Sequence, residues 1–344
     1  MLVFRIAFLL LFQASITIQA SEDKSIILQL EGKWKFSIGD DKTWANSDFD
    51  DSAWESIKVP SAWEDQGFFG YDGYAWYRNS FSVSREMKTK EIFISLGYIN
   101  DVDQVFINGN LIGFSGSFPP DYSSATEALR KYPIPAEFLN ASGKNVIAVR
   151  VYNFQMSGGI VSGDVGIFSY NTPKSDLPLS GLWLFRTGDN TAWKSIYCKD
   201  KLWEKIVVPG NWENQGFKDY DGIAWYRKHF VVTNDYLNQK VLLIIGRIDN
   251  TDEVYLNGIL IGATGKINDL KNKKKEALTE TDNHKLRIYN IPDNLLTSKR
   301  ENVLTIRVSD IELKGGIVEG PLGLIKLTNF NRLYKDFDIE QGKK

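Results

Sequence analysis

The stretch PSAWEDQGFFGYDGYAWYR, residues 60–78, decides how this chain of 344 residues is organised. It returns as PGNWENQGFKDYDGIAWYR, residues 209–227, with 13 of its 19 positions identical. The chain has 10 tryptophans, which form five pairs at one offset of 149 residues, as Trp63 and Trp212 do. One offset shared by so many rare residues indicates an internal duplication, and each copy is long enough to be a full domain.

The offset changes to 157 from Arg130 onward. The second copy therefore carries eight extra residues between Gly265 and Arg287. The stretch between these two residues includes the charged run Lys271–Glu276, which we expect to be a solvated loop. The segment NTPKSDLP, residues 171–178, has the composition of a linker and separates the two copies.

The apolar pattern of both copies is typical of β-strands. Residues 92–96 and 147–151 alternate between two faces, which is the period of a half-buried strand. Asn-Gly pairs at 108–109 and 257–258 stand between apolar runs and predict hairpins with type I′ turns. Many short strands with glycine-rich turns predict an all-β protein of two tandem antiparallel sandwiches. The boundaries we predict are a signal peptide at 1–20, a first sandwich at 28–170, a second at 178–328 and a polar tail at 329–344.

The composition limits the classes of partner. A formal net charge of -2 offers no electrostatic footprint for nucleic acid or for an anionic membrane surface. An aromatic content of 13% suits both a sandwich core and a surface that stacks on sugar rings. The single cysteine, Cys198, excludes an intramolecular disulfide.

The N-terminus has the pattern of a secretory signal peptide. Arg5 supplies a positive charge, residues 6–12 form a short apolar run, and Ala20 is a small residue suited to cleavage before Ser21. The apolar run is too short for a membrane-spanning helix, and no long apolar run follows. We therefore expect an exported protein, periplasmic or secreted, without a membrane span.

Six motifs recur in the same order in both copies, and together they resemble the sugar-binding domain of glycoside hydrolase family 2. The resemblance implies a galactose-binding-like jelly-roll fold in each copy. The variants R-K-Y-P-I-P and R-I-Y-N-I-P are similar to the accessory domain of sialate O-acetylesterase-like proteins. The fold hosts many functions, so the resemblance is specific for the domain and not for a ligand. The motifs are G-x-W-x-F at 32–36 and 181–185, V-P-x-x-W at 59–63 and 208–212, D-G-x-x-W-Y-R at 72–78 and 221–227, D-x-V-x-x-N-G-x-x-I-G at 103–113 and 252–262, N-V-x-x-[VI]-R-V at 145–151 and 302–308, and G-G-I at 158–160 and 315–317.

The sequence departs from the family where its enzymes carry out catalysis. The segment beside the family's catalytic barrel has glycine, Gly163 or Gly320, in place of the usual arginine, and the sequence has no barrel. It lacks a G-x-S-x-G motif, and neither His229 nor His284 has a histidine counterpart in the other copy. Glu64 with Asp72 is a conceivable carboxylate pair for a glycosidase, but no motif marks it. We therefore expect a protein that is not an enzyme.

Two short stretches, one in each copy, concentrate residues suited to carbohydrate binding. An aromatic ring offers an apolar face to a sugar, and carboxylate and guanidinium groups bind its hydroxyls. The alternative is structural: aromatic rings pack the loop down, and Arg78 packs on Trp76 and pairs with a carboxylate such as Asp103. The candidate ligand-binding residues are Trp63, Glu64, Tyr71, Asp72, Trp76, Arg78, Trp212, Glu213, Tyr220, Asp221, Trp225 and Arg227.

No cofactor is expected from the motifs. Asp101, Asp103 and Asp252 could contribute to a structural calcium site, because Ca²⁺ takes several oxygen ligands, but they do not form a recognisable calcium loop.

The leading hypothesis is an exported, non-catalytic carbohydrate-binding or accessory protein that acts in glycan recognition or degradation. Two copies would give avidity for a polymeric glycan. One alternative is a structural or protein-interaction module that docks with a separate glycoside hydrolase. Another is a glycosidase or carbohydrate esterase with an unrecognised site.

Overall fold

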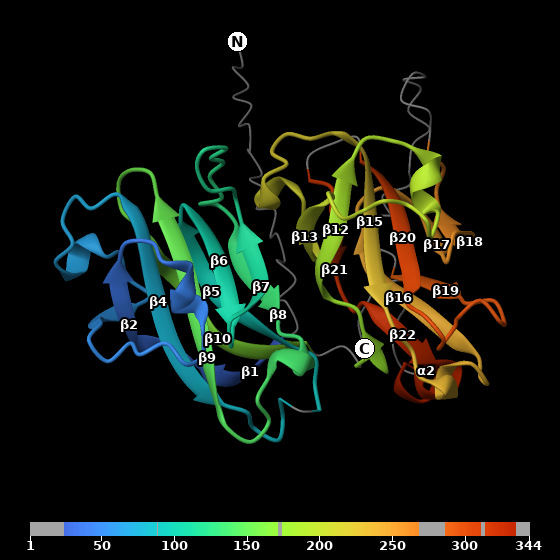
Figure 1. Ribbon diagram of the computed structural model, residues 1–344, viewed down its shortest axis with the longest axis horizontal. Helices are drawn as coiled ribbons and strands as arrows, with labels where there is room; N and C mark the ends of the chain where they lie inside the picture. Colours follow the sequence, from blue (N-terminus) through green and yellow to red (C-terminus); the bar gives the residue numbers. More distant parts are fainter. Residues whose placement is uncertain (1–23, 88, 171–173, 268–285, 311–313, 335–344) are drawn as a thin grey trace, which may run out of the picture.

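The computed structural model describes residues 24–87, 89–170, 174–267, 286–310 and 314–334. The predicted signal peptide and the charged run at 271–276 lie outside the described residues. The described chain forms two β-sandwiches that lie side by side (Figure 1). The predicted all-β class is therefore confirmed.

The first sandwich is built from antiparallel strands in two sheets. Their orders are β1-β10-β5-β8 and β3-β2-β4-β9-β6-β7, so strands distant in sequence lie side by side, as in a jelly roll. The strands are β1 (Lys24–Gln29), β2 (Gly32–Ile38), β3 (Glu55–Val59), β4 (Gly73–Ser82), β5 (Ile92–Asn100), β6 (Val102–Ile107), β7 (Asn110–Ser115), β8 (Leu129–Pro133), β9 (Lys144–Asn153) and β10 (Gly159–Tyr170). Short 3-10 helices are η1 (Lys42–Ala45), η2 (Glu64–Gln66) and η3 (Ala136–Phe138).

The second sandwich repeats this plan. One sheet has the order β13-β12-β15-β20-β17-β18, and the other has β11-β22-β16-β21-β14 with β19 also paired to β16. The strands are β11 (Leu177–Pro178), β12 (Gly181–Thr187), β13 (Glu204–Val208), β14 (Gly210–Asn211), β15 (Gly222–Phe230), β16 (Val241–Ile248), β17 (Thr251–Leu256), β18 (Ile259–Thr264), β19 (Arg287–Asn290), β20 (Asn302–Asp310), β21 (Gly316–Glu319) and β22 (Gly323–Lys326). The helices are η4 (Thr191–Lys194), η5 (Glu213–Gln215), η6 (Asn234–Tyr236) and α2 (Leu327–Leu333).

The two faces of β4 carry different parts of the core. Tyr77 points between the sheets, where its ring lies 4.9 Å from that of Phe36. Trp76 points the other way into a smaller cluster, with its ring 6.2 Å from that of Trp44. A strand sends alternate side chains to opposite faces, so both faces of this sheet are covered by aromatic rings.

The predicted Asn-Gly hairpins are present. Asn108 and Gly109 have φ angles of 49° and 80°, and Asn257 and Gly258 have 50° and 84°, as a type I′ turn requires. The first turn joins β6 to β7, and Asn108 also binds its surroundings: its Nδ2 donates to the carbonyl of Phe138 at 2.8 Å. These asparagines are therefore structural.

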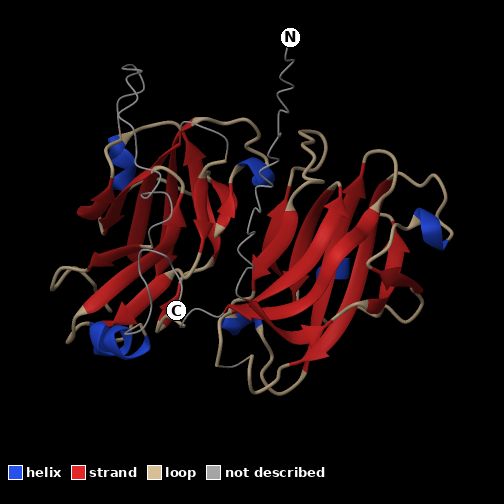
Figure 2. Ribbon diagram, turned by 180° about the vertical axis from the view of Figure 1, so that it is seen from behind, coloured by secondary structure: helices blue, strands red, loops and turns tan. Residues whose placement is uncertain are grey.

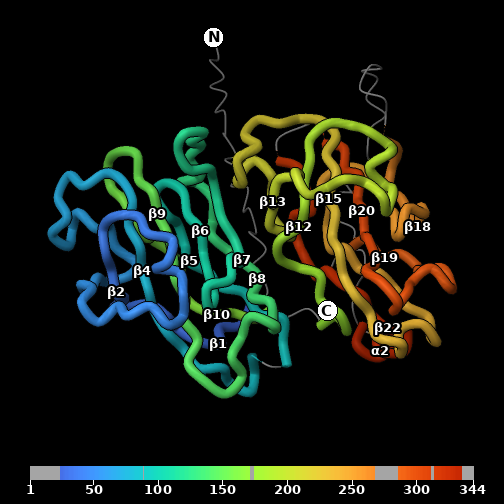
Figure 3. Tube along the Cα trace, in the orientation of Figure 1, coloured from blue at the N-terminus to red at the C-terminus, as the bar shows by residue number. Residues whose placement is uncertain are grey.

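The two sandwiches are in direct contact along β7 of the first and β12 and β13 of the second (Figure 3). Val207 of the second domain packs into the hydrophobic core cluster of the first. The backbone N–H of Gly116 donates to the carbonyl of Asn214 at 2.8 Å, which ties the two domains by a main-chain hydrogen bond. The linker thus joins domains that share buried surface.

Helix α2 corrects the predicted end of the second domain. We expected a polar tail from residue 329, yet residues 327–333 are helical and Tyr334 is buried. Helix α2 lies on the outer face of the β16 sheet (Figure 2), where Phe330 packs against a cluster that contains Ile244 and Ile325. Apolar residues spaced along this short segment gain burial by covering the sheet, which outweighs its polar composition.

Candidate functional site

Trp63 lies in the core, where the loop after β3 folds back over the sandwich. Its side chain is fully buried. Its indole Nε1 donates to Oε1 of Glu64 at 2.6 Å and to the carbonyl oxygen of Tyr71 at 3.2 Å. Trp212 is buried in the same way and donates to the carbonyl oxygen of Tyr220 at 3.1 Å. Neither indole offers a face to a ligand in this structure, which corrects the stacking role that we predicted.

The first glycine of the G-G-I motif makes room for the indole ring of Trp63 in the first copy and of Trp212 in the second. A Cβ atom on Gly158 would lie 1.9 Å from Cζ2 of Trp63, and one on Gly315 would lie 2.1 Å from Cζ2 of Trp212. Any side chain at either glycine would displace the ring, because packed cores have no room for an added methyl group. The motif and the tryptophan form one structural unit although they are far apart in sequence.

Arg78 holds the loop between η1 and β3. It is buried, its Nε donates to Oδ2 of Asp51 at 2.8 Å, and its Nη1 donates to the carbonyl oxygens of Trp44 and Asn46. Asp51 is therefore the carboxylate that pairs with Arg78, which corrects the predicted pairing with Asp103. With its donors bound to protein oxygens, this guanidinium is a clamp for a long loop and not a contact for sugar hydroxyls.

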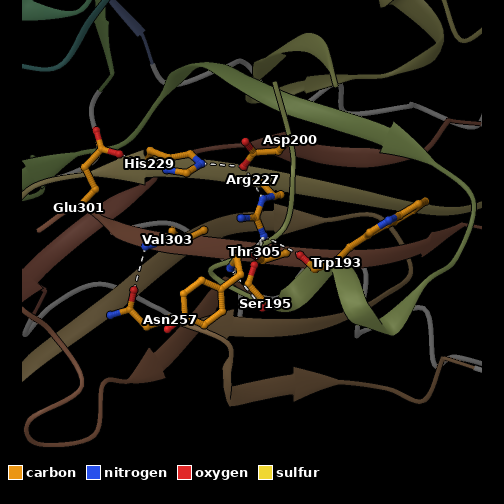
Figure 4. Close-up of polar contacts among 10 residues, drawn as sticks. Trp193, Ser195, Asp200, Arg227, His229, Asn257, Glu301, Val303 and Thr305 are labelled. Atoms are coloured by element: carbon orange, nitrogen blue, oxygen red, sulfur yellow. Dashed lines mark hydrogen bonds and ion pairs between the residues drawn. The ribbon is translucent and has the colours of Figure 1, made fainter. Parts of the chain in front are cut away.

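Arg227 repeats the clamp in the second domain (Figure 4). Its Nε donates to Oδ2 of Asp200 at 2.9 Å, and its Nη1 donates to Oγ1 of Thr305 at 3.1 Å and to the carbonyl oxygens of Trp193 and Ser195. Trp76 and Trp225, the remaining predicted aromatic platforms, are also fully buried. The tryptophans and arginines of both Trp-Tyr-Arg segments therefore have a structural role, as the alternative interpretation predicted.

His229 links Asp200 of the second clamp to one further carboxylate, Glu301. Its Nε2 lies 2.8 Å from Oδ2 of Asp200, and its Nδ1 lies 3.3 Å from Oε2 of Glu301 (Figure 4). Burial alone would raise the pKa of Asp200, but the hydrogen bonds with His229 and Arg227 outweigh burial and lower this pKa. His229 therefore favours the ionised form of Asp200, which is the form that pairs with Arg227.

Glu64 and Glu213 close the loop against the G-G-I motif. Both carboxylate oxygens of Glu64 accept from the N–H of Gly158, at 3.2 and 3.1 Å. Oε1 of Glu213 accepts from the N–H of Gly315 at 2.9 Å, whereas its Oε2 is buried without a hydrogen-bond partner among the described residues. Burial raises the pKa of Glu213. The glutamate occupies the same place in both copies. Both of its oxygens accept hydrogen bonds in the first copy, and only one does so among the described residues in the second.

The carboxylates of Asp72 and Asp221 are the exposed members of the predicted set. Tyr71 and Tyr220 are half-buried, and each hydroxyl donates to a backbone carbonyl three residues on, at 2.7 and 2.6 Å. Burial raises the pKa of both phenols. Asp72 accepts from Nδ2 of Asn153 at 3.3 Å, which places the predicted loop beside the end of β9.

Exposed apolar side chains lie on the same loop as Asp72 and on the segment that follows β9. Phe69 is 83% exposed, Met156 is 82% exposed and Phe154 is 54% exposed. The ring of Tyr122 stacks on Phe154, with centroids 5.4 Å apart and planes inclined by 27°. We call the group Phe69, Asp72, Tyr122, Phe154 and Met156 the first-domain rim.

Two hydrogen bonds join the loops of the rim, one between Asp72 and Asn153 and one between Glu64 and Gly158. One signal in the sequence could have indicated the rim. Phe69 lies within the repeated stretch but has Lys218 as its counterpart, so the first copy places an aromatic ring at an exposed position that the fold does not require. Exposed rings on a rigid loop are typical of binding surfaces.

The aspartates considered for calcium are engaged by protein groups. Oδ1 of Asp103 lies 2.7 Å from Nε of Arg130, and its Oδ2 accepts from the hydroxyl of Tyr132 at 2.7 Å. Asp252 is bound in the same way, and Oδ2 of Asp101 accepts from a backbone N–H at 2.7 Å. Within the described ranges no group of three or more His, Cys, Asp or Glu residues is placed to hold a metal ion. Asp103 and Asp252 therefore use both carboxylate oxygens in contacts within the protein.

The known proteins that this chain resembles are β-galactosidases and β-glucuronidases. Residues 39–157 match the family model of the β-galactosidase second all-β domain. Over 160 residues the chain is 34% identical to a presumed β-glucuronidase of Formosa agariphila, and over 167 residues it is 28% identical to the β-galactosidase BoGH2A of Bacteroides ovatus. This chain carries β-sandwich domains related to those of glycoside hydrolase family 2.

These relatives are much longer proteins. The matches cover 43% and 45% of this chain but only 14% and 17% of the two relatives. Among solved structures, a β-glucuronidase of Bacteroides uniformis aligns over 84% of this chain and 28% of its own, with 19% identity and a TM-score of 0.37. The described part of this chain contains no helix long and apolar enough to cross a membrane.

Proposed function

We propose that this chain is an exported, non-catalytic carbohydrate-binding or accessory protein that acts in glycan recognition or degradation. The observation that carries the proposal is the first-domain rim, on a domain related to the β-sandwiches of glycoside hydrolase family 2. Phe69 and Phe154 expose apolar ring faces, and Asp72 exposes a carboxylate that accepts from sugar hydroxyls. The small number of such groups implies weak binding, on the order of micromolar to millimolar.

The relatives suggest which glycans to try. Their names describe β-galactosidases and β-glucuronidases, so β-galactosides and β-glucuronides are the first probes. The resemblance to the accessory domain of sialate O-acetylesterase-like proteins makes sialylated glycans the second set. Export by the predicted signal peptide would bring the protein to such polymers outside the cytoplasm.

A glycan array followed by calorimetric titration tests the proposal. Phe69→Ala and Asp72→Asn should each weaken binding about tenfold, since each removes one contact of about 1–2 kcal/mol. Tyr197→Ala is the matched control, because this ring is 86% exposed on the second domain and lies outside the rim. Melting temperatures should stay unchanged in all three variants. Binding that is equal in all of them would contradict a glycan site at the rim.

Docking with a separate glycoside hydrolase is the second candidate, and the same exposed apolar side chains favour it. Met156 and Phe69 are the kind of residues that protein interfaces bury. If docking is the function, Met156→Ala and Phe69→Ala should abolish co-sedimentation with a purified family 2 enzyme. Loss of glycan binding without loss of docking would favour the first candidate.

A further inference from the structure

A groove of about 320 Å³ lies between the two sandwiches, and none of its lining residues belongs to the first-domain rim. Tyr98 and Lys131 line it from the first domain, and Asn211 and Asn214 line it from the second. Small-molecule sites occur preferentially where two domains meet, and this volume is at the lower end of their usual range of roughly 300–1,000 Å³. The groove exists only because the two copies are joined in this arrangement.

The second-domain wall presents free polar groups on a fixed backbone. Gln215 is buried, and its Nε2 donates to the carbonyl of Asn211 at 3.2 Å, while the carbonyl of Asn214 accepts from Gly116 of the first domain at 2.8 Å. The side-chain amides of Asn211 and Asn214 make no hydrogen bond with the described residues. An amide offers two donors and an acceptor, which match a pair of neighbouring sugar hydroxyls.

The first-domain wall supplies an aromatic ring. Tyr98 is 40% exposed and combines an apolar face with a hydroxyl. Beside it, Nζ of Lys131 lies 4.9 Å from the centroid of the Tyr170 ring, and that ring packs on Phe93 with centroids 4.6 Å apart. An amphipathic ring next to firmly packed neighbours is a suitable platform for a sugar.

Several of the polar residues that line the groove differ between the two copies. Asn211 and Asn214 have Ala62 and Asp65 as counterparts in the first copy, while Lys314 has Ser157. The core motifs, in contrast, are shared, so a demand of the fold does not explain these differences.

The first-domain wall diverges in the same way. Tyr98 has Arg247 as its counterpart, Lys131 has Ile288 and Tyr170 has Leu327. Ile288 and Leu327 are packed in the cluster that α2 covers. In the second copy this face of the sheet is apolar and is covered by α2. In the first copy the equivalent face is polar and open.

We propose that the groove between the domains binds one neutral sugar unit of a glycan, with Tyr98 stacking on the ring and Asn211 and Asn214 binding its hydroxyls. The inference rests on the proposed carbohydrate-binding function and adds a second site, distinct from the rim. Charged groups do not define the ligand, because the lining balances two cations, Lys131 and Lys314, against two anions, Glu127 and Glu319. Glu319 is also paired with Arg247 at 2.6 Å. The side-chain amides of Asn211 and Asn214 and the ring of Tyr98 thus suit a neutral pyranose.

The test is a nuclear magnetic resonance titration of the full chain with lactose, with glucuronic acid as the acidic comparison. The side-chain amide signals of Asn211 and Asn214 report on the groove, and the backbone amide of Gly158 reports on the rim. Lactose should shift the groove signals more than glucuronic acid does. Tyr98→Ala should weaken the lactose affinity read at Asn211 and Asn214 about tenfold. The exposed control Tyr197→Ala should leave that affinity unchanged.

Three other results of the titration would contradict the proposed groove site. Shifts confined to Gly158 and its neighbours, with the groove signals unmoved, would overturn the groove while leaving the proposed function in place. Groove signals that move equally in Tyr98→Ala and in the unaltered chain would also overturn it. If neither set moves with any sugar of the array, both proposals fall. Melting curves recorded on the same samples exclude unfolding of the variants as the cause.

Discussion

The guanidinium of Arg130 and the carboxylate of Asp103 lie 2.7 Å apart, and both side chains are inaccessible to solvent. The second copy repeats the pair with Arg287 and Asp252 at 3.0 Å. Further donors of Arg130 bind the carbonyl oxygens at 101, 125 and 128, so this one side chain joins the start of β6 to the loop before β8. A buried pair of this kind is satisfied only while both partners are present.

Removing one partner should therefore be costly. We expect Asp103→Asn to lower the free energy of unfolding by about 3–5 kcal/mol, because the arginine charge stays buried without its counter-ion. Asp164→Asn is the matched control: it breaks the exposed pair with Lys24 at 3.0 Å and should cost less than about 1 kcal/mol. Urea unfolding of both variants measures the difference. Equal losses would contradict the structural role of the buried pair.

The buried position of Trp63 makes a second prediction. Trp63→Ala should destabilise the first domain by about 3–5 kcal/mol, since it removes a buried indole and leaves a cavity. Phe69→Ala, nine positions from the start of the same repeated stretch, should stay within about 0.5 kcal/mol because its ring is exposed. Calorimetric melting compares the two. A stable Trp63→Ala protein would mean that the indole is not part of the core in solution.

Glu213 predicts a dependence of stability on pH. Burial raises its pKa in the folded protein above the ordinary value of 4.5. The stability that its protonated form contributes is therefore complete below about pH 4.5 and is lost as the pH rises through the folded pKa. Glu213→Gln stays neutral, so this variant should be more stable than the parent at pH 7 and equally stable near pH 4.

Glu64→Gln is the control for that experiment. Both oxygens of Glu64 accept hydrogen bonds from the N–H of Gly158, so neutralising this carboxylate removes favourable contacts. It should therefore give no gain in stability at pH 7. Unfolding free energies measured across pH 4 to 8 compare the two variants. A gain at Glu64 as large as that at Glu213 would show that the orphaned oxygen of Glu213 is not the cause.

The division into two domains predicts that each half folds alone. Residues 24–170 and 174–334 each have their own hydrophobic core cluster, so each should unfold in a single cooperative transition. The first half should melt at a lower temperature than it does in the full chain, because Val207 of the second domain completes its core. Scanning calorimetry of the three proteins tests this. The absence of a cooperative transition in either half would contradict the division.

The hydrogen bonds of Glu64 also predict the absence of glycosidase activity at the rim. Its two oxygens are held by Gly158 and Trp63, so Glu64 is not free to work with Asp72 across a glycosidic bond. The purified protein should not hydrolyse aryl β-galactosides or aryl acetates above the buffer rate. Turnover that Asp72→Asn abolishes would move the protein to the class of hydrolases.

The sequence by itself determined the duplication, the all-β class and the Asn-Gly turns. These features are local: a strand alternates with a period of two, and a type I′ turn needs two neighbouring residues with positive φ. The same sequence patterns recur in both copies, so each copy supports the assignment made for the other.

Only the tertiary structure decided that Trp63 is a core residue and Phe69 an exposed one. Both lie in a loop, where no period separates an inward side chain from an outward one. What buries Trp63 is Gly158, and the hydrogen bond between Glu64 and Gly158 spans 94 residues of sequence. The groove between the domains depends on a contact from Gly116 to Asn214 that neither copy carries alone. Burial is a property of such distant contacts, and a linear pattern of residue types does not contain them.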